Sequence, residues 1–405
     1  MTQMWQRRYL GDEIELAYGK SLPAHLRKPG DVPVFGSNGV IGRHDTATVE
    51  GPGIVVGRKG SIGEVGYSPD AFWPIDTTYF VVNKGRNSWR FLFHMLRSAE
   101  LTKLNSHSAV PGLNREDVYS IEMGFPPQDE QNRIASAIDF IERCSGLEEQ
   151  AITGATKLKR AAMRDLFARG LRGEGQKETD FGLIPDCWRI EVLSVCAEVQ
   201  TGVAKGRKFA DAEMVELPYL RVANVQDGHL DLTEMKTIKI RRSEIERYRL
   251  QPGDVVLTEG GDFDKLGRGF IWRGEVNLCV HQNHVFAVRP NRDQLVPEFF
   301  AYLAQSSYGK AYFLQVAHKT TNLACINTTK LKAFPVLIPP LDEQYEIVGI
   351  LDAIDRKIDL HKRKKGVLEA LFKALLRKLM TGEIRVADLD LSALADTAKG
   401  ADAAA

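Results

Sequence analysis

Cysteine is scarce in this sequence and scattered along it. The five residues Cys144, Cys187, Cys196, Cys279 and Cys325 form no C-x-x-C pair, which argues against a zinc site and fits a reducing compartment. The sequence also lacks a run of about 18 apolar residues, the minimum for a membrane-spanning helix. Its start, MTQMWQRRYL, lacks the apolar core of a signal peptide. We therefore expect a cytoplasmic protein without a bound metal.

An excess of charge of one sign is absent as well. The 54 Lys and Arg residues nearly balance 53 Asp and Glu residues, which leaves a net charge of +1. This balance neither supports nor excludes nucleic acid, because a phosphate backbone responds to the local distribution of charge. Two segments are locally basic, and they contain Lys157, Lys159, Arg160, Arg164, Arg169 and Arg172 in one case and Lys362, Arg363, Lys364, Lys365, Lys373, Arg377 and Lys378 in the other.

What the sequence does contain is an internal repeat. The stretch FPPQDEQNRI begins at Phe125, and a near copy, IPPLDEQYEI, begins at Ile338. The two prolines hold the chain extended, because a proline disfavours the helical conformation of the residue before it. The Asp-Glu pair that follows places negative charge where the first turn of a helix favours it. Each copy therefore predicts the start of a helix.

A heptad pattern follows the second copy. Apolar residues recur at spacings of four and three, with polar residues in the middle of the seam; the seam positions are Ile347, Leu351, Ile354, Ile358, His361, Lys365, Leu368, Phe372, Leu375 and Leu379. This predicts a helix of roughly 60 Å that ends near Gly382.

The first copy has a weaker seam. Its apolar positions are Ile134, Ile138, Ile141, Ala162 and Leu166, and its middle holds Ser145, Glu148 and Gly154, where a bend is conceivable. Helices that merely join domains would expose these seams to water, which is costly. We expect the two helices to pack on each other.

The segments before the two helices are rich in predicted strands. Short β-branched runs such as GIVVGRKG, TTYFVV, DVVLTEGG and HVFAVRP alternate with glycine-rich turns. Single helices are predicted over residues 89–104 and 297–314. The two segments also resemble each other, since PGIVVGRKG at Pro52 matches PGDVVLTEGG at Pro252, and GLNREDVYSIEMGFPP at Gly112 matches CINTTKLKAFPVLIPP at Cys325.

The predicted fold is α+β. It consists of two strand-rich mixed domains separated by two long helices, which pack as an antiparallel coiled coil in a pseudo-twofold repeat. The predicted boundaries are 1–124 and 182–337 for the strand-rich domains, 125–181 and 338–386 for the helical regions, and 387–405 for a disordered Ala/Asp-rich tail. Loops that differ between the halves are expected if each half recognises something different.

This order of domains and P-P-x-D-E-Q helices, closing in LMTGEIRV at 379–386, resembles the specificity subunits of Type I restriction-modification systems, which serve in phage defence. The resemblance covers nearly the whole chain apart from the tail. It implies a non-catalytic subunit with two target recognition domains, each reading one half of a bipartite sequence in double-stranded DNA. Each domain should resemble the small DNA-reading domain of adenine-N6 methyltransferases.

The resemblance also implies partners. The helices would fix the separation of the two domains and dock two methylation subunits for adenine-N6 methylation, and restriction (motor-nuclease) subunits could join the complex. S-adenosylmethionine is expected on the methylation subunits, and ATP and Mg on a restriction subunit, with no cofactor on this chain.

A self-sufficient methyltransferase or nuclease is the alternative. Adenine methyltransferases carry Asn or Asp, two prolines and an aromatic residue, but FPPQ and IPPL fail at both outer positions. GRKGSIGEVG lacks the spacing of a phosphate-binding loop. A nuclease needs clustered carboxylates, and DFDK at Asp262 or EMK at Glu234 are common in charged loops. A coiled-coil scaffold that does not touch DNA is a third reading.

Metal binding by His281 and His284 is disfavoured, because residues three apart on a strand face opposite sides. One of them could present a donor to DNA while the other packs inside.

The candidate DNA-reading residues are polar side chains in loops, with Arg suited to guanine, Asn or Gln to adenine, and Lys, Ser and Thr to phosphates. An ordinary turn or capping role is an equally good interpretation of any single one of them. The candidates in the first half are Ser37, Asn38, Arg58, Lys59, Ser61, His107 and Ser108. Those in the second half are Lys205, Arg207, Lys208, Arg221, Asn224, His281, Gln282, Lys319, Thr320, Thr321 and Asn322.

Overall fold

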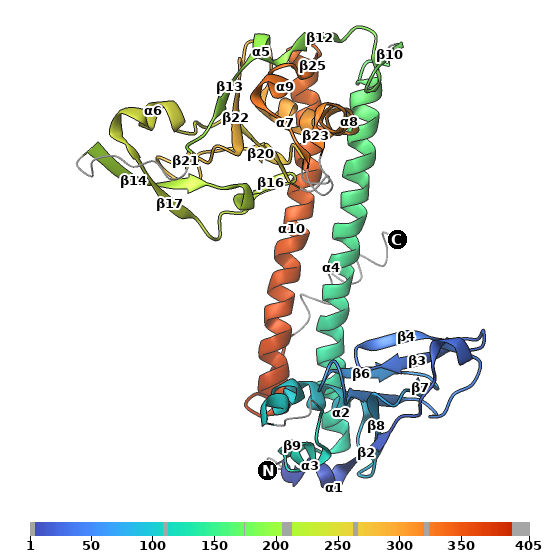
Figure 1. Cartoon of the computed structure of the whole chain (residues 1–405). Coiled ribbons are helices and arrows are strands. Elements are labelled where there is room, and N and C mark those ends of the chain that lie inside the picture. Colours follow the sequence, from blue (N-terminus) through green and yellow to red (C-terminus); the bar gives the residue numbers. More distant parts are fainter. Residues whose placement is uncertain are drawn as a thin grey trace. The chain divides into compact units, whose positions relative to one another are not determined.

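The computed structural model describes residues 5–107, 112–173, 175–204, 213–261, 266–319 and 324–390. The chain divides into two compact units, one formed by residues 1–151 with 361–405 and the other by residues 152–360. Two long helices, α4 (Gln128–Arg169) and α10 (Leu341–Met380), belong to both units, because each helix has one end in the first unit and its other end in the second (Figure 1). Within the described ranges, no helix has both the length and the apolar character needed to cross a membrane.

The first unit contains three small sheets. One is antiparallel with the order β2-β8-β5-β6, another has the order β4-β3-β7 with β3 parallel to β7, and β1 pairs with β9. The strands are β1 (Gln6–Tyr9), β2 (Ile14–Tyr18), β3 (Val32–Gly36), β4 (Gly39–His44), β5 (Gly53–Gly57), β6 (Val65–Ser68), β7 (Trp73–Pro74), β8 (Thr78–Asn83) and β9 (Glu122–Phe125). The helices are α1 (Leu10–Glu13), α2 (Trp89–Ser98) and α3 (Arg115–Tyr119), with 3-10 turns at Ala24–Leu26 and Leu101–His107.

The second unit repeats this plan. Its four-stranded sheet has the order β13-β22-β18-β20, its three-stranded sheet the order β17-β14-β21 with β14 parallel to β21, and β12 pairs with β25. The shared elements are β12 (Arg189–Val192), α5 (Leu193–Cys196), β13 (Ala197–Thr201), β14 (Met214–Leu220), β17 (Lys236–Arg241), β18 (Val255–Thr258), β20 (Gly269–Ile271), β21 (Val280–His281), β22 (Val285–Pro290), α7 (Pro297–Gln305), α9 (Thr328–Lys332) and β25 (Pro335–Ile338).

Further elements occur in the second unit and have no counterpart among the named elements of the first. They are β10 (Gln176–Thr179), β11 (Gly182–Pro185), β15 (Val225–Gln226), β16 (His229–Leu230), α6 (Ile245–Tyr248), β19 (Gly260–Gly261), α8 (Ser307–Val316), β23 (His318–Lys319) and β24 (Ala324–Cys325), with 3-10 turns at Val222–Asn224 and Arg242–Glu244. The first unit in turn has a 3-10 turn at Val386–Asp388 after α10. The predicted α+β repeat is therefore confirmed, with different additions to a common frame.

The helices predicted over 89–104 and 297–314 are both shorter in the structure. In the first unit, α2 ends at Ser98, and Glu100 then adopts a left-handed φ of 48° before a 3-10 turn begins. In the second unit, α7 ends at Gln305 and Ser306 starts α8, where its hydroxyl accepts a hydrogen bond from Gly309 N at 3.2 Å. A serine that caps a new helix breaks the old one without any glycine or proline.

The predicted seam between α4 and α10 is confirmed in each unit. In the first unit, Ile134 and Ile138 near the start of α4 share a core with Leu375 and Leu379 near the end of α10, so the helices pack antiparallel. In the second unit, the core contains the end of α4 together with the start of α10, contributed by Met163, Leu166, Phe167, Ile347, Val348 and Leu351. Burying each such side chain stabilises the fold by about 1.5–3 kcal/mol.

The seam becomes polar toward the middle of the helices, as the heptad pattern indicates. In the first unit, His361 Nδ1 lies 2.5 Å from Glu148 Oε2, and Lys365 Nζ lies 2.5 Å from Glu149 Oε2. At Gly154, where the sequence left a bend or irregularity open, α4 continues as one helix. A polar pair in an otherwise apolar seam favours one register, because any other register would leave its charges unpaired.

The glutamine of each P-P-x-D-E-Q motif is buried and joins the long helix to its own strand-rich segment. Gln131, which is 4% exposed, accepts a hydrogen bond from Ser88 N at 2.9 Å and donates to Pro126 O at 3.0 Å. Ser88 is the N-cap residue of α2. The glutamine thus connects the start of α4 with the start of α2, the helix that lies against strands β5 and β6.

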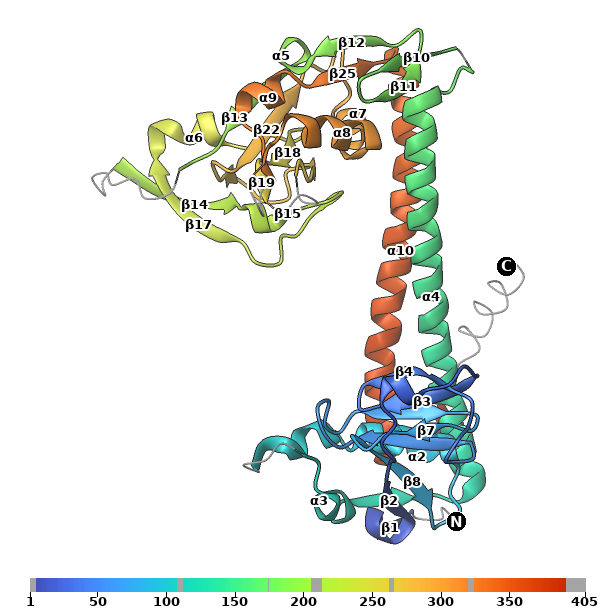
Figure 2. The same ribbon diagram turned by 45° about the vertical axis from the view of Figure 1, so that its right-hand side comes forward.

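The second motif makes the same connection. Gln344 is fully buried; it accepts from Val296 N at 2.8 Å and donates to Pro339 O at 2.9 Å and Gln294 O at 3.0 Å. Val296 is the N-cap residue of α7, which lies between the four-stranded sheet and α10 (Figure 2). We call this repeated arrangement the glutamine bridge.

A second polar contact reinforces each bridge. His94 of α2 lies 2.6 Å from Asp139 of α4 through its Nε2 atom. At the corresponding place in the second unit, the hydroxyl of Tyr302 lies 2.6 Å from Asp352 and 2.8 Å from Asp355. The geometry is therefore kept although the donor changes from an imidazole to a phenol.

Both long helices end at a glycine with a left-handed backbone next to a tryptophan. Gly170 has φ 61° and Gly382 has φ 71°, a conformation that favours glycine after a helix C-terminus. A Cβ atom on Gly170 would lie 3.3 Å from the Trp188 ring, and one on Gly382 would lie 3.6 Å from the Trp5 ring. The predicted end of the second helix near Gly382 is confirmed.

Candidate nucleic-acid interface

Several candidates of the first half come together at one edge of the first unit. Arg58 N and Lys59 N both donate to Thr77 O at 3.0 Å, and Leu113 N donates to Arg58 O at 2.9 Å. The turn after β3 lies beside them, because a Cβ atom on Gly60 would be 3.3 Å from Ser37 Oγ. We call this set of converging loops the reading edge of the first unit.

The reading edge includes a stack of side chains that sequence reasoning missed. The guanidinium groups of Arg58 and Arg115 each lie 4.9 Å from the ring centre of Tyr18, which is 53% exposed. Arg58 Nη1 also donates to Asp76 O at 3.1 Å. Burial raises the pKa of the neighbouring Tyr79, whose hydroxyl donates to Leu113 O at 3.1 Å. No local sequence signal marks Tyr18 or Arg115.

A cavity of about 190 Å³ lies at the same edge. It is lined by the turn that contains Ser37 and Asn38 and by residues of β5 and β6, among them Val55, Val65 and the intervening Glu64. Asn38 and Lys59 are exposed, whereas Ser37, Arg58 and Ser61 are half-buried. The cavity places a carboxylate and an amide within one small concave surface.

The corresponding edge of the second unit has the same backbone but other side chains. Glu259 N donates to His284 O at 3.0 Å, Ile326 N donates to Glu259 O at 2.8 Å, and Gln282 N donates to Leu220 O at 2.9 Å. The His284 Nδ1 atom lies 2.5 Å from Glu259 Oε2. Glu259 was not among the predicted contacts, whereas His284 was predicted only as one of the pair, with His281, of which one could present a donor to DNA. This set of loops is the reading edge of the second unit.

Two predicted residues of the second half are buried. Asn224 is 3% exposed and its amide donates to Asp231 O and Glu234 O at 2.8 and 3.1 Å, so it shapes a turn. His281 is fully buried, and its Nδ1–H donates to Val285 O at 2.6 Å. Burial lowers the pKa of His281 to about 4, so the ring is neutral at pH 7. Neither side chain can reach a base in this conformation.

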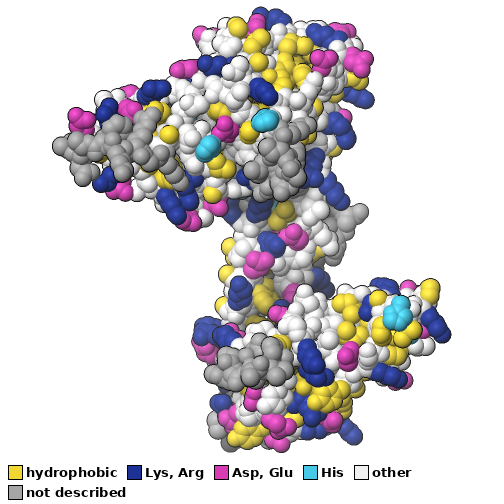
Figure 3. All heavy atoms as spheres, in the orientation of Figure 1, with side chains coloured by type: hydrophobic (Ala, Val, Ile, Leu, Met, Phe, Trp, Pro, Cys, Tyr) yellow, Lys and Arg dark blue, Asp and Glu magenta, His cyan; other side chains and the backbone are white. Residues whose placement is uncertain are grey.

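Arg221 and Gln282 are half-buried. The guanidinium of Arg221 turns away to donate to Glu234 O at 2.9 Å. The remaining candidates lie outside the described residues, either entirely or by their side chains, and they are His107, Ser108, Lys205, Arg207, Lys208, Lys319, Thr320, Thr321 and Asn322. On the face that Figure 3 shows, Lys and Arg side chains alternate with Asp and Glu rather than forming one basic patch.

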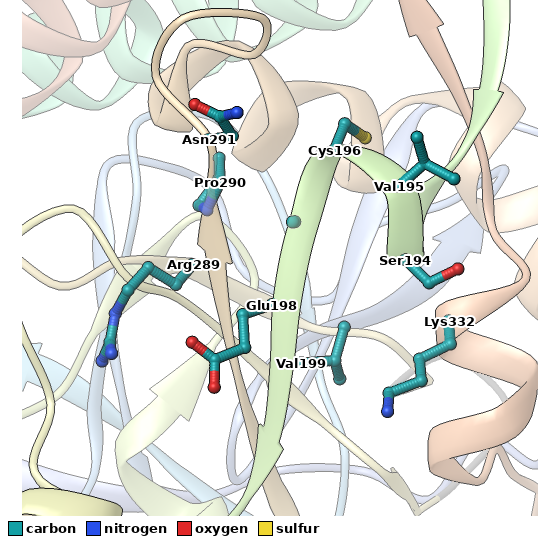
Figure 4. Close-up of a pocket in the computed structure, with 10 residues that line it drawn as sticks. Ser194, Val195, Cys196, Glu198, Val199, Arg289, Pro290, Asn291 and Lys332 are labelled. Carbon is teal, nitrogen blue, oxygen red and sulfur yellow. The ribbon is translucent and has the colours of Figure 1, made fainter.

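A larger depression, of about 630 Å³, lies in the second unit, beside β13 and the end of β22. Figure 4 shows Glu198, Arg289, Asn291 and Lys332 around it. Arg289 is committed to the buried Asp254 through two hydrogen bonds of 2.7 and 2.8 Å, which raise the pKa of Arg289. The depression borders the ends of β13 and β22 remote from the reading edge.

Among the described residues, His94, Asp139 and Glu142 come close enough to hold a metal ion. Arginines already occupy the two carboxylates, because Arg90 Nε donates to Asp139 at 2.9 Å and Arg97 Nη1 donates to Glu142 at 2.9 Å. Burial opposes ionisation of Asp139, but hydrogen bonds from His94 and Arg90 outweigh it and lower its pKa to about 2. The residues present therefore fit an ion-pair cluster better than a metal site.

Together, the duplicated frame and the two edges with unlike side chains define a protein built from two related strand-rich units. The family model described as "Type I restriction modification DNA specificity domain" matches residues 3–156 and 196–370, and the chain belongs to this family.

Similar proteins bear this out. The Type I restriction enzyme MjaVIII specificity subunit of Methanocaldococcus jannaschii is 24% identical over 317 residues, which are 74% of this chain and 71% of that protein. The provisionally assigned MjaX specificity subunit of the same organism is 28% identical over 209 residues, 51% of this chain and 49% of that protein. The match to MjaX thus spans about half its length. The crystal structure of the S subunit from M. genitalium shares the fold, with a TM-score of 0.59, 16% identity, and coverage of 94% of this chain and 97% of that one.

Proposed function

We propose that this chain is the DNA sequence-recognition subunit of a Type I restriction-modification complex, and that its two units read the two halves of a bipartite target. The observation that carries this proposal is the pair of reading edges. They share a backbone hydrogen-bond pattern but differ in the side chains that they present, as Arg58 and Glu259 illustrate. A protein that read one sequence twice would not need this difference.

The long helices are suited to set the distance between the half-sites. The 42 residues of α4 and the 40 residues of α10 correspond to about 60 Å at about 1.5 Å per residue. Half-sites on one side of a duplex lie about 34 Å apart, one helical turn. We propose that the helices span this interval and dock two methylation subunits.

Chemistry is assigned to those partners. The methylation subunits would bind S-adenosylmethionine and methylate adenine N6 in each half-site, while restriction subunits, where they join, would use ATP and Mg²⁺. This chain would contribute affinity for double-stranded DNA and sequence choice in the cytoplasm. The alternative, a self-sufficient methyltransferase or nuclease, requires activity from the isolated chain.

Methylome sequencing of cells with and without the gene tests the proposal. A split motif that contains adenine in both parts should lose methylation when the gene is deleted and regain it on complementation. Purified chain alone, supplied with DNA and either S-adenosylmethionine or Mg²⁺, should remain inactive. Unchanged methylation on deletion would contradict the proposal, and activity of the isolated chain would favour the alternative.

A further inference from the structure

Arg58 and Glu259 occupy the same backbone position in the two units. Each directly follows an inner strand of its four-stranded sheet, β5 or β18. The amide nitrogen of each donates at 3.0 Å to the residue just before the neighbouring strand, Thr77 or His284. The carbonyl of each accepts at 2.9 or 2.8 Å from the residue two places before α3 or α9. Because three landmarks agree, the two side chains leave equivalent points of the frame.

The charges at this position are opposite, and each is held by its own unit. Arg58 stacks on Tyr18 at 4.9 Å and donates to Asp76 O. The carboxylate of Glu259 is held by His284, while 30% of the glutamate side chain and 55% of the histidine side chain remain exposed. Both charged groups are therefore restrained in orientation and accessible to a ligand.

An exposed carboxylate at such an edge is unfavourable for binding DNA unless it meets a donor, because the phosphate backbone repels it. A surface ion pair with histidine contributes little to stability. In the major groove, guanine offers the acceptors O6 and N7, which suit arginine, whereas cytosine N4 and adenine N6 are donors, and glutamate accepts from cytosine N4. The positive Arg58 therefore suits a base that offers acceptors, and the negative Glu259 suits a base that offers a donor.

We propose that this position selects a base in each half-site: Arg58 selects guanine in one, and Glu259, held by His284, selects a base with a major-groove amino group in the other. Tyr18 and His284 act as positioning residues. This inference rests on the proposed function, since it names the residues by which the two units differ in what they read.

The test uses the assembled complex in cells, with methylome sequencing of three single variants. Glu259→Ala should relax one base position in one half-site, where a preference of about 5- to 150-fold is lost. Arg58→Ala should relax one guanine position in the other half-site by a similar factor. Glu178→Ala, which removes an exposed carboxylate from β10 of the same unit as Glu259, serves as the matched control and should leave the motif intact.

The untouched half-site is an internal control, because its continued recognition shows that the complex has assembled. The relaxed position also identifies the base, cytosine or adenine. A Glu259→Ala complex that still reads the parent motif would overturn the inference. Loss of all methylation would also overturn it, because that result would mean that Glu259 is needed for folding or assembly rather than for the choice of one base. If the unsubstituted complex methylates no split motif, the proposed function fails instead.

Discussion

Replacing Gln344 by methionine tests whether the glutamine bridge holds the second unit together. Methionine keeps the length of the side chain but removes its hydrogen bonds. Three backbone groups then lose their partner inside the protein, namely Val296 N, Gln294 O and Pro339 O. A buried polar group without a partner costs about 1–3 kcal/mol. We expect a loss of about 3–5 kcal/mol.

For a unit of about 200 residues, each kcal/mol lowers the melting temperature by about 2–4 °C. Thermal unfolding of the Gln344→Met chain should therefore begin about 10 °C earlier, and hydrogen exchange at the Val296 amide should accelerate. Gln315→Met, on the exposed face of α8, is the control for the change in residue type. If both variants melt together and Val296 stays protected, the bridge does not stabilise the unit and the reasoning is refuted.

Further predictions concern buried charge and DNA contact. As the pH falls from 6.5 to 4, the protein should lose about 3 kcal/mol of stability through His281, because its folded-state pKa of about 4 lies below the unfolded value of about 6.5. His281→Asn should abolish this loss, as measured by acid denaturation. His229→Asn, at an exposed site, should not. His361→Leu should destabilise the seam by about 3 kcal/mol by leaving the Glu148 carboxylate unpaired, and adding Glu148→Leu should restore the stability in urea titrations; a double variant no better than the single one would refute a paired role. Lys59→Ala should weaken binding to all duplexes alike and reduce the salt slope by about 1; a sequence-dependent loss would instead indicate a base contact.

The sequence predicted the helices well because their signals are local. A proline pair lies directly before each of α4 and α10, and an acidic pair lies in the first turn of each, so that the helices begin at Gln128 and Leu341 as these signals indicate. The seam can also be predicted from nearby residues alone, because apolar residues at heptad spacing identify the buried face of a helix wherever its partner lies. Even the polar middle of the seam, with Glu148 and His361, is visible in the pattern.

The parts that the sequence concealed depend on residues far apart in the chain. The role of Gln131 requires Ser88, 43 residues earlier, and no pattern around either residue announces the contact. Matching Pro52 with Pro252 aligns Lys59 with Glu259, whereas the hydrogen bonds align Arg58 with Glu259. A shift of one residue changes which side chains correspond, and only the pairing of strands reveals it.

The burial of Asn224 and His281 has the same origin. Both are polar residues of segments predicted to contact DNA, but tertiary packing turns them inward, where they donate hydrogen bonds to backbone carbonyls. Sequence composition shows which residues could meet a base, and not which of them the fold leaves at the surface.

The repeat also explains how two unlike reading edges can share one frame. At the position of Arg58 and Glu259, the bonds that define the frame come from backbone N–H and C=O groups, which every residue except proline supplies in full. The side chains are braced separately, by Tyr18 in one unit and by His284 in the other. Substitutions at partly exposed positions of this kind typically change stability by less than about 0.5 kcal/mol, whereas a changed base contact alters discrimination by about 1–3 kcal/mol. Specificity can therefore change at the reading edge while the glutamine bridge and the helical seam stay the same.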